Sequence, residues 1–168
     1  MTDASAAVQP AMPVWPHDNT AAKNAFYGDF HAADWQAKYL TRITPPFVMR
    51  YSKNPIPSLL VNRMCAAAFL SCFNDIWNAC GHDQAKVDAT GASDFGGCFN
   101  IRPIAGSNSW SNHSWACAMD LSPGSNGFNV QKTTLGKIVV DTFKAHGARW
   151  GGDYKGRKDP MHFEFVQP

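Results

Sequence analysis

Apolar residues repeat at helical spacing in three parts of the chain. Residues 59–80 contain no Gly or Pro and predict the principal helix, with Ser58 as its N-cap and Gly81 as its C-cap. A second helix is expected from about residue 133 to 146, and residues 19–39 also have helical composition. We expect the principal helix to form core scaffold rather than carry chemistry.

The remaining apolar segments are shorter and predict strands. Strands are expected at residues 98–104, 115–121, 148–150 and 161–166. Polar, glycine-rich stretches predict loops or turns at residues 82–97, 105–112 and 122–127. A few short strands among two to four helices predict an α+β domain with a small antiparallel sheet.

The chain is long enough for one domain with a substantial core. Its 168 residues contain no internal repeat, and we expect a loose arm at residues 1–16 followed by a single domain at 17–168. The first ten residues lack the basic and apolar regions of a secretory signal, and nowhere do eighteen apolar residues stand together. We therefore expect a product made in the cytoplasm, without a membrane span.

Charge and cysteine content exclude some classes of protein. A net charge of +2 is too small to indicate a nucleic-acid-binding protein. The five cysteines are odd in number and include no CxxC pair, so we expect buried thiols in a reducing compartment. One disulfide, for example with Cys98, remains an alternative.

Residue types near the end of the chain predict a metal site. On a strand, His162 and Glu164 share one face. Together with His113 and Asp120, His162 completes a set of two histidines and a carboxylate, a ligand set used by catalytic Zn²⁺. Asp159 lies three residues before His162, where a carboxylate could act as a general base. Any one of these residues alone would be an ordinary surface or turn residue, so the prediction depends on their combination.

The neighbouring residues resemble a known family. Residues 111–120 resemble the SxHxxGxAxD motif of the zinc D-Ala-D-Ala carboxypeptidase superfamily, whose fold is described as hedgehog-like. Residues 150–154 and 158–164 look like the WGGDW…DPxHFE ending of its L-alanyl-D-glutamate endopeptidase branch, which consists mainly of phage endolysins. The resemblance is good over about residues 98–166 and loose before residue 80. Ala116 stands where the family motif has glycine.

The resemblance implies a role for each matching residue. It implies one Zn²⁺ bound at the sheet face by His113, Asp120 and His162, with Asp159 as catalytic base. Arg102 falls where the family has an arginine that steadies the developing oxyanion; a structural salt bridge is the alternative for this residue. Supporting or substrate-binding roles are implied for a further set of residues: Ser111, Glu164, Asp153, Tyr154, Trp115 and Trp110.

The function implied is that of a zinc-dependent peptidoglycan hydrolase, an endolysin with bacteriolytic, antimicrobial action. The expected bond is L-alanyl-D-glutamate in the stem peptide, and the expected enzyme is a monomer held in the host cytoplasm until release to the cell wall. A D,D-carboxypeptidase or D,D-dipeptidase with the same zinc chemistry is one alternative. A non-catalytic zinc-binding or wall-binding module is another.

Overall fold

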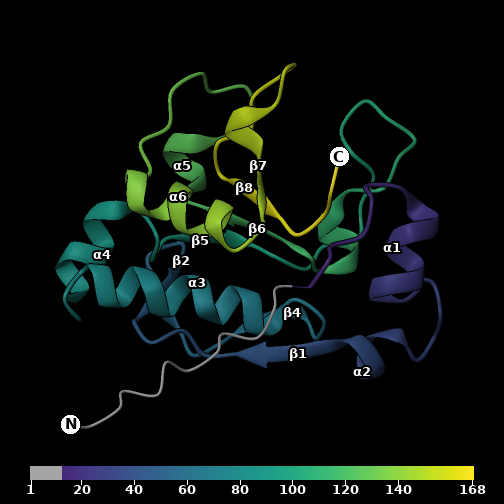
Figure 1. Cartoon of the computed structure of the whole chain (residues 1–168), viewed down its shortest axis with the longest axis horizontal. Helices are drawn as coiled ribbons and strands as arrows, with labels where there is room; N and C mark the ends of the chain where they lie inside the picture. Colours follow the sequence, from purple (N-terminus) through teal and green to yellow (C-terminus); the bar gives the residue numbers. More distant parts are fainter. Residues whose placement is uncertain (1–12) are drawn as a thin grey trace, which may run out of the picture.

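The computed structural model describes residues 13–168, which form an α+β domain with small antiparallel sheets (Figure 1). The first half of this part contains α1 (Thr20–Tyr27), α2 (Trp35–Tyr39), β1 (Leu40–Ile43), β2 (Met49–Tyr51), β3 (Asn54–Ile56), β4 (Leu59–Asn62), α3 (Ala66–Ala79) and α4 (Gln84–Thr90). The second half contains β5 (Phe95–Gly97), the 3-10 helix η1 (Asn112–Trp115), β6 (Ala118–Leu121), α5 (Pro123–Asn126), α6 (Lys137–Ala145), β7 (Arg149–Trp150), the 3-10 helix η2 (Gly151–Asp153) and β8 (His162–Glu164). The predicted fold class is confirmed.

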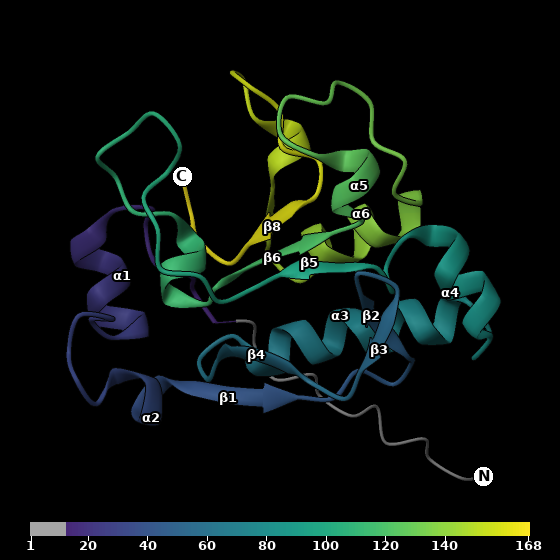
Figure 2. The ribbon, with the colours of Figure 1, turned by 180° about the vertical axis from the view of Figure 1, so that it is seen from behind.

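The main sheet has four strands in the order β5-β6-β8-β7, and every pair in it is antiparallel. Two smaller antiparallel pairs, β1–β4 and β2–β3, form separate sheets. Figure 1 shows α3 crossing the middle of the molecule, with the main sheet on one side and β1 on the other. Figure 2 shows the β2–β3 hairpin beside β5.

The core between α3, α6 and the main sheet is rich in phenylalanine. Phe69 of α3 lies with its ring 4.8 Å from that of Phe165 and 6.4 Å from that of Phe143 on α6. Phe143 in turn packs 4.5 Å from Phe163 of β8. All four rings are fully buried, and each such ring contributes roughly 2–3 kcal/mol of burial free energy. This core fixes β8 and, with it, the polar residues on the opposite face of the strand.

The principal helix is shorter than the sequence predicts. Residues 59–62 form β4, which pairs with β1 in the register Leu40↔Asn62 to Ile43↔Leu59, and the helix begins only at Ala66. Only four residues, 59–62, are involved, and their pairing with β1 outweighs the helical spacing of their apolar side chains. Ser58 is therefore not the helix N-cap; Cys65 occupies that position, and Cys80 rather than Gly81 is the C-cap.

Other boundaries also differ from the prediction. Within the predicted loop 82–97, Asp83 caps α4 by accepting hydrogen bonds from two backbone N–H groups, and β5 follows. Residues 98–104 form no regular strand, and the predicted turn at 122–127 contains the short helix α5. The second helix is confirmed but begins later, at Lys137.

The expected N-terminal arm lies mostly outside the described residues, which begin at residue 13. Its last residues are attached to the domain: Trp15 is buried, with its ring 4.6 Å from that of Phe165. The backbone N–H of Gln167 also donates a hydrogen bond to the Pro16 carbonyl of this segment. Within residues 13–168, none of the helices has the length and apolar character needed to cross a bilayer.

All five cysteines are buried with free thiols. The Sγ atoms of Cys98 and Cys65 lie 3.4 and 3.7 Å from the carbonyl oxygen of Ala116. Burial raises the pKa of both thiols well above the ordinary value, which makes them poor nucleophiles. The alternative of a disulfide is not realised in this structure.

Candidate metal centre

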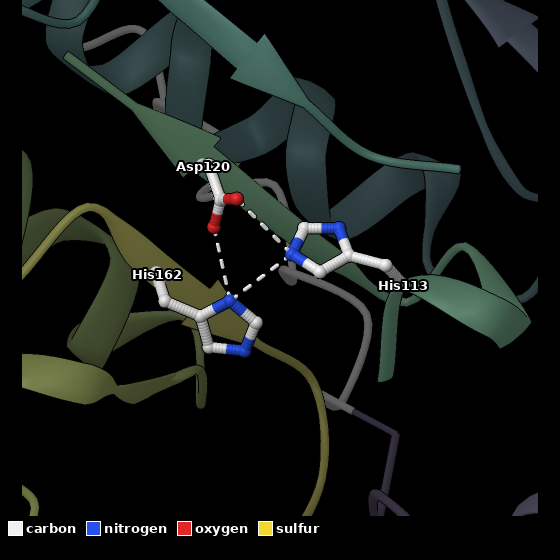
Figure 3. Close-up of side chains that lie close together, drawn as sticks. All are labelled: His113, Asp120 and His162. Atoms are coloured by element: carbon white, nitrogen blue, oxygen red, sulfur yellow. Dashed lines mark hydrogen bonds and ion pairs between the residues drawn. The ribbon is translucent and has the colours of Figure 1, made fainter. Parts of the chain in front are cut away.

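Three separate elements bring His113, Asp120 and His162 together. His113 is in η1, Asp120 is in β6, and His162 opens β8. Asp120 and His162 are direct partners in the register of β6 and β8, so the sheet itself aligns them. Figure 3 shows the three side chains pointing toward one another. All three are buried, and their candidate ligand atoms form a group that could hold a metal ion.

The three side chains form a triangle, in which Asp120 faces each histidine with a different carboxylate oxygen. His113 Nε2 lies 3.2 Å from His162 Nδ1 and 3.2 Å from Asp120 Oδ2, and His162 Nδ1 lies 3.0 Å from Asp120 Oδ1. Ligands at ~2.0–2.1 Å from a tetrahedral Zn²⁺ are about 3.3 Å apart. These separations are close to those that this ion needs, and a tetrahedral ion held by three side chains would keep its fourth position for water.

The outer nitrogen of each ring has a partner that leaves the inner nitrogen free to bind a cation. His113 Nδ1 lies 2.8 Å from the Cys98 carbonyl oxygen, which can only accept, so Nδ1 carries the proton. His162 Nε2 lies 3.0 Å from Oε2 of Glu164. If both rings were neutral, two nitrogen lone pairs and a carboxylate would face and repel one another. A bound cation would replace this repulsion with attraction.

In the metal-free protein, a proton on His162 supplies the positive charge that balances the neighbouring carboxylates. Burial disfavours a charged His162, but hydrogen bonds to Asp120 and Glu164 outweigh it and raise the pKa of His162 well above its usual range. Burial likewise opposes ionisation of Asp120, yet hydrogen bonds from His113 and His162 hold the pKa of Asp120 well below its usual range. A metal ion would have to displace the proton on His162.

Glu164 lies beside His162, on the side of the ring away from the other two candidate ligands. Its Oε2 faces His162 and accepts a 2.6 Å hydrogen bond from Asn112 Nδ2. Its Oε1 accepts a 2.6 Å hydrogen bond from the Tyr154 hydroxyl and lies 3.2 Å from Nε of Arg149. Burial alone would raise the pKa of Glu164, but these partners, with His162 foremost, lower it to about 2. The carboxylate is therefore ionised and fixed in place.

A buried ionic group lies behind Glu164 and was not predicted from the sequence. Lys23 of α1 is 4% exposed and donates hydrogen bonds of 2.6 Å to Asn112 and 2.9 Å to Asp18. Asp18 also receives a 3.1 Å hydrogen bond from Arg149. A lysine in a short amphipathic helix carries no sequence signal for such a role. Asn112, which is next to His113 in the motif, was the residue that could have been anticipated.

Asp159 is held by the backbone of the WGGD segment. Its N–H donates to the Gly151 carbonyl at 3.0 Å, and its own carbonyl accepts from the N–H of His162 at 3.0 Å. A Cβ atom on Gly151 would lie 2.3 Å from the Asp159 carbonyl oxygen, so only glycine permits this approach. The Oδ1 atom of Asp159 is buried without a hydrogen-bond partner, and burial raises the pKa of this carboxyl.

Arg102 is attached through its backbone to the segment that carries His113. The Arg102 carbonyl accepts from the N–H of Ser111 at 3.0 Å and from the hydroxyl of Ser114 at 3.2 Å. Ser111 also caps η1, with its Oγ accepting from the N–H of His113 at 3.4 Å. Among residues 13–168, the Arg102 guanidinium forms no ion pair, so the alternative of a structural salt bridge is not realised.

Two of the expected supporting residues lie away from the site. Trp115 is fully buried in the core, with its ring 4.8 Å from that of Phe30, so it cannot contact a substrate as was expected. The Asp153 carboxylate is exposed and paired with Lys144. Tyr154 fits its expected position, through Glu164. Trp110 is partly buried against Phe30.

Ala116, the departure from the family motif, adopts a left-handed conformation with φ 53° and ψ 32°. Its carbonyl accepts hydrogen bonds from Asn62 N–H at 2.9 Å and lies near two cysteine thiols. This conformation is the one in which glycine is most readily accommodated, which gives a physical reason for a glycine in the motif. The alanine retains the backbone turn that leads from η1 into β6.

Cavities lie on both sides of the three ligands. A cavity of about 530 Å³ extends from Arg102, His113 and Asp120 toward β5 and the β2–β3 hairpin. A second cavity, of about 350 Å³, contains Asp159, His162 and Glu164. Both are lined by Arg102 and His113. The candidate metal centre therefore lies where the two cavities meet rather than at the end of one cavity.

Residues 105–165 match the sequence model of a family described as D-alanyl-D-alanine carboxypeptidase. The matched segment contains all three candidate ligands together with Asp159 and Glu164, and it begins after Arg102. No solved structure matches the chain at a significant level. Together, the family match and the His-Asp-His triangle support a zinc metallopeptidase.

Proposed function

We propose that this protein is a zinc-dependent peptidoglycan endopeptidase that cleaves the stem peptide between L-alanine and D-glutamate. The observation that carries the proposal is the pair of cavities that meet at His113 and Arg102. An endopeptidase must hold peptide on both sides of the bond it cuts, whereas a carboxypeptidase needs room for only one residue beyond it. The second candidate, a D,D-carboxypeptidase, is favoured by the description of the matching family.

The residues present fit one Zn²⁺, held by His113 Nε2, Asp120 and His162 Nδ1. When bound, the ion supplies Lewis acidity and lowers the pKa of a water molecule toward ~7. Asp159 accepts the proton of the attacking water at its carboxylate and later delivers it to the leaving amine. Its buried, unpartnered Oδ1 is suited to this exchange because no protein donor competes for it.

Arg102 provides the complementary positive charge. Arg102 is exposed and lines both cavities, so its N–H donors are available to a carbonyl bound between them. Donors aimed at a developing oxyanion typically contribute about 3 kcal/mol of barrier reduction. Glu164 keeps the His162 ring in one orientation and one tautomer while these steps occur.

We also propose that the protein acts as a monomer and is an endolysin, which reaches the cell wall only after release from the host cytoplasm. This part of the proposal is supported by the resemblance of residues 150–154 and 158–164 to the endolysin branch.

The test is digestion of purified peptidoglycan, followed by identification of the new termini by mass spectrometry. New D-glutamate amino termini and new L-alanine carboxyl termini are the expected products. Release of free D-alanine with no cut after L-alanine would instead establish the carboxypeptidase. Intact peptidoglycan in the presence of zinc-loaded protein would favour a non-catalytic zinc module.

A further inference from the structure

The larger cavity is bounded by elements that take no part in the candidate metal centre. Its wall includes Arg42 of β1, Tyr51 and Ile56 of the hairpin, and Phe95 and Phe99 at β5. Figure 2 shows the hairpin standing beside β5, and the rings of Tyr51 and Phe95 are 6.4 Å apart. Substrate that extends past the metal centre in this direction would contact these residues.

Apart from the candidate metal ligands, the charged side chains of the larger cavity are all positive. Besides the ligands His113 and Asp120, its charged side chains are Arg42 and Arg102, and neither pairs with a carboxylate within residues 13–168. Arg42 is exposed, and its Nη1 donates one hydrogen bond of 3.2 Å to the Ser58 hydroxyl. Most of its donors are therefore available to a ligand.

The smaller cavity has charged side chains of both signs. Its additional arginine, Arg149, is already paired with Asp18 at 3.1 Å and with Glu164 at 3.2 Å. Asp159 adds a further carboxylate to this side. Arg102 lines both cavities, so the unpaired charges that distinguish them are Arg42 in the larger and Asp159 in the smaller cavity. An anionic group of the substrate is therefore favoured in the larger cavity.

We propose that Arg42 binds a free carboxylate of the substrate, namely the α-carboxylate of the D-glutamate that follows the scissile bond. This inference rests on the proposed function. In the stem peptide, D-glutamate is joined onward through its side-chain carboxyl, so its α-carboxylate remains free next to the bond. The L-alanine side carries no carboxylate. The planar guanidinium can bind a carboxylate through two parallel hydrogen bonds, which makes Arg42 a determinant of specificity.

The experiment compares two synthetic muropeptides that differ in one group, the α-carboxylate of D-glutamate or its carboxamide. We expect the wild-type enzyme to cleave the carboxylate form with a kcat/KM at least tenfold higher. Arg42→Gln should lower kcat/KM for the carboxylate form at least tenfold and leave the carboxamide form within twofold. Lys86→Gln is the matched control, because Lys86 is an exposed residue of α4 outside both cavities; it should change neither value.

The two proposals fail in different ways. If the wild-type enzyme cuts after L-alanine but Arg42→Gln affects both peptides equally, or neither, the assignment of Arg42 is wrong and the proposed function stands. If the wild-type enzyme cuts neither peptide after L-alanine, the proposed function fails and the assignment to this carboxylate fails with it. Thermal unfolding of each variant checks that the fold is retained.

Discussion

Glu164 Oε2 lies 3.0 Å from Nε2 of His162, on the side of the ring opposite to the nitrogen that faces Asp120 and His113. The two residues are separated by one position in β8 and share the face of the strand that points away from the phenylalanine core. A carboxylate in this place fixes the tautomer of the ring and increases the basicity of the nitrogen that binds the metal.

We therefore expect Glu164→Gln to weaken zinc binding about 10–100-fold, the usual effect of removing such a partner. The affinity is measured by competition with a chelating dye. Asp153→Asn is the matched control, because it removes the same charge from an exposed carboxylate that pairs with Lys144. Equal affinities for the Glu164 variant and the wild type would contradict the role given to this carboxylate.

Asp159 should affect catalysis and not metal binding. Asp159→Asn keeps the volume of the side chain but cannot accept a proton, so we expect kcat to fall about 10²–10⁴-fold. Zinc content, measured by atomic absorption, should stay at the wild-type value because Asp159 is outside the ligand triangle. A variant that hydrolyses the wall at the wild-type rate with its zinc in place would show that another group is the base.

Gly151 is expected to matter because of Asp159. In Gly151→Ala the new Cβ would lie 2.3 Å from the Asp159 carbonyl oxygen, which must move. A displacement of about 1 Å at a catalytic group can cost on the order of 10²-fold in rate. Gly156→Ala is the control, since a Cβ there meets no atom within 4 Å. Activity assays of both variants check this prediction, and similar activities would contradict it.

The stabilisation that zinc provides should increase with pH. In the metal-free protein the pKa of His162 is raised, so its contribution to stability is full below the unfolded value of ~6.5 and is lost as pH rises through the folded pKa. The pKa values of Asp120 and Glu164 are lowered, so their contributions are present above ~4.5 and are lost on acidification. The metal-free site is thus most favourable between these limits.

Zinc must displace the proton of His162, which becomes easier as pH rises. We expect the difference in Tm between zinc-loaded and chelated protein to grow from pH 5 to pH 8. Calorimetry or circular dichroism on the two forms measures it. A Tm difference that is constant or that shrinks over this range would contradict the presence of a proton on His162 in the metal-free protein.

The sequence was most informative where local chemistry determines position. His162 and Glu164 share a face because strand periodicity requires it, and Phe163 between them is buried on the opposite face. The contact of Asp120 with His162 was anticipated from the ligand types, although the pairing of β6 with β8 was not. Nothing in a single sequence specifies such a register.

The sequence was least informative where distant segments decide the structure. Residues 59–62 are apolar enough for a helix, and only pairing with β1 makes them a strand. Lys23 and Asn112 are separated by 89 positions in the chain, yet they form a 2.6 Å hydrogen bond beside the candidate metal centre. The resemblance implied a supporting or substrate-binding role for Trp115, but its side chain is fully buried among core residues from distant parts of the chain.

The central claim is that one zinc ion at His113, Asp120 and His162 is required for peptide hydrolysis. The most direct measurement is a titration of chelated, zinc-free protein with Zn²⁺ while cleavage of a muropeptide is followed. We predict no cleavage without zinc and a linear recovery that ends at about one equivalent per chain, with no recovery in His162→Ala. Full hydrolysis by verified zinc-free protein, or recovery in the His162 variant at the same stoichiometry, would contradict the account.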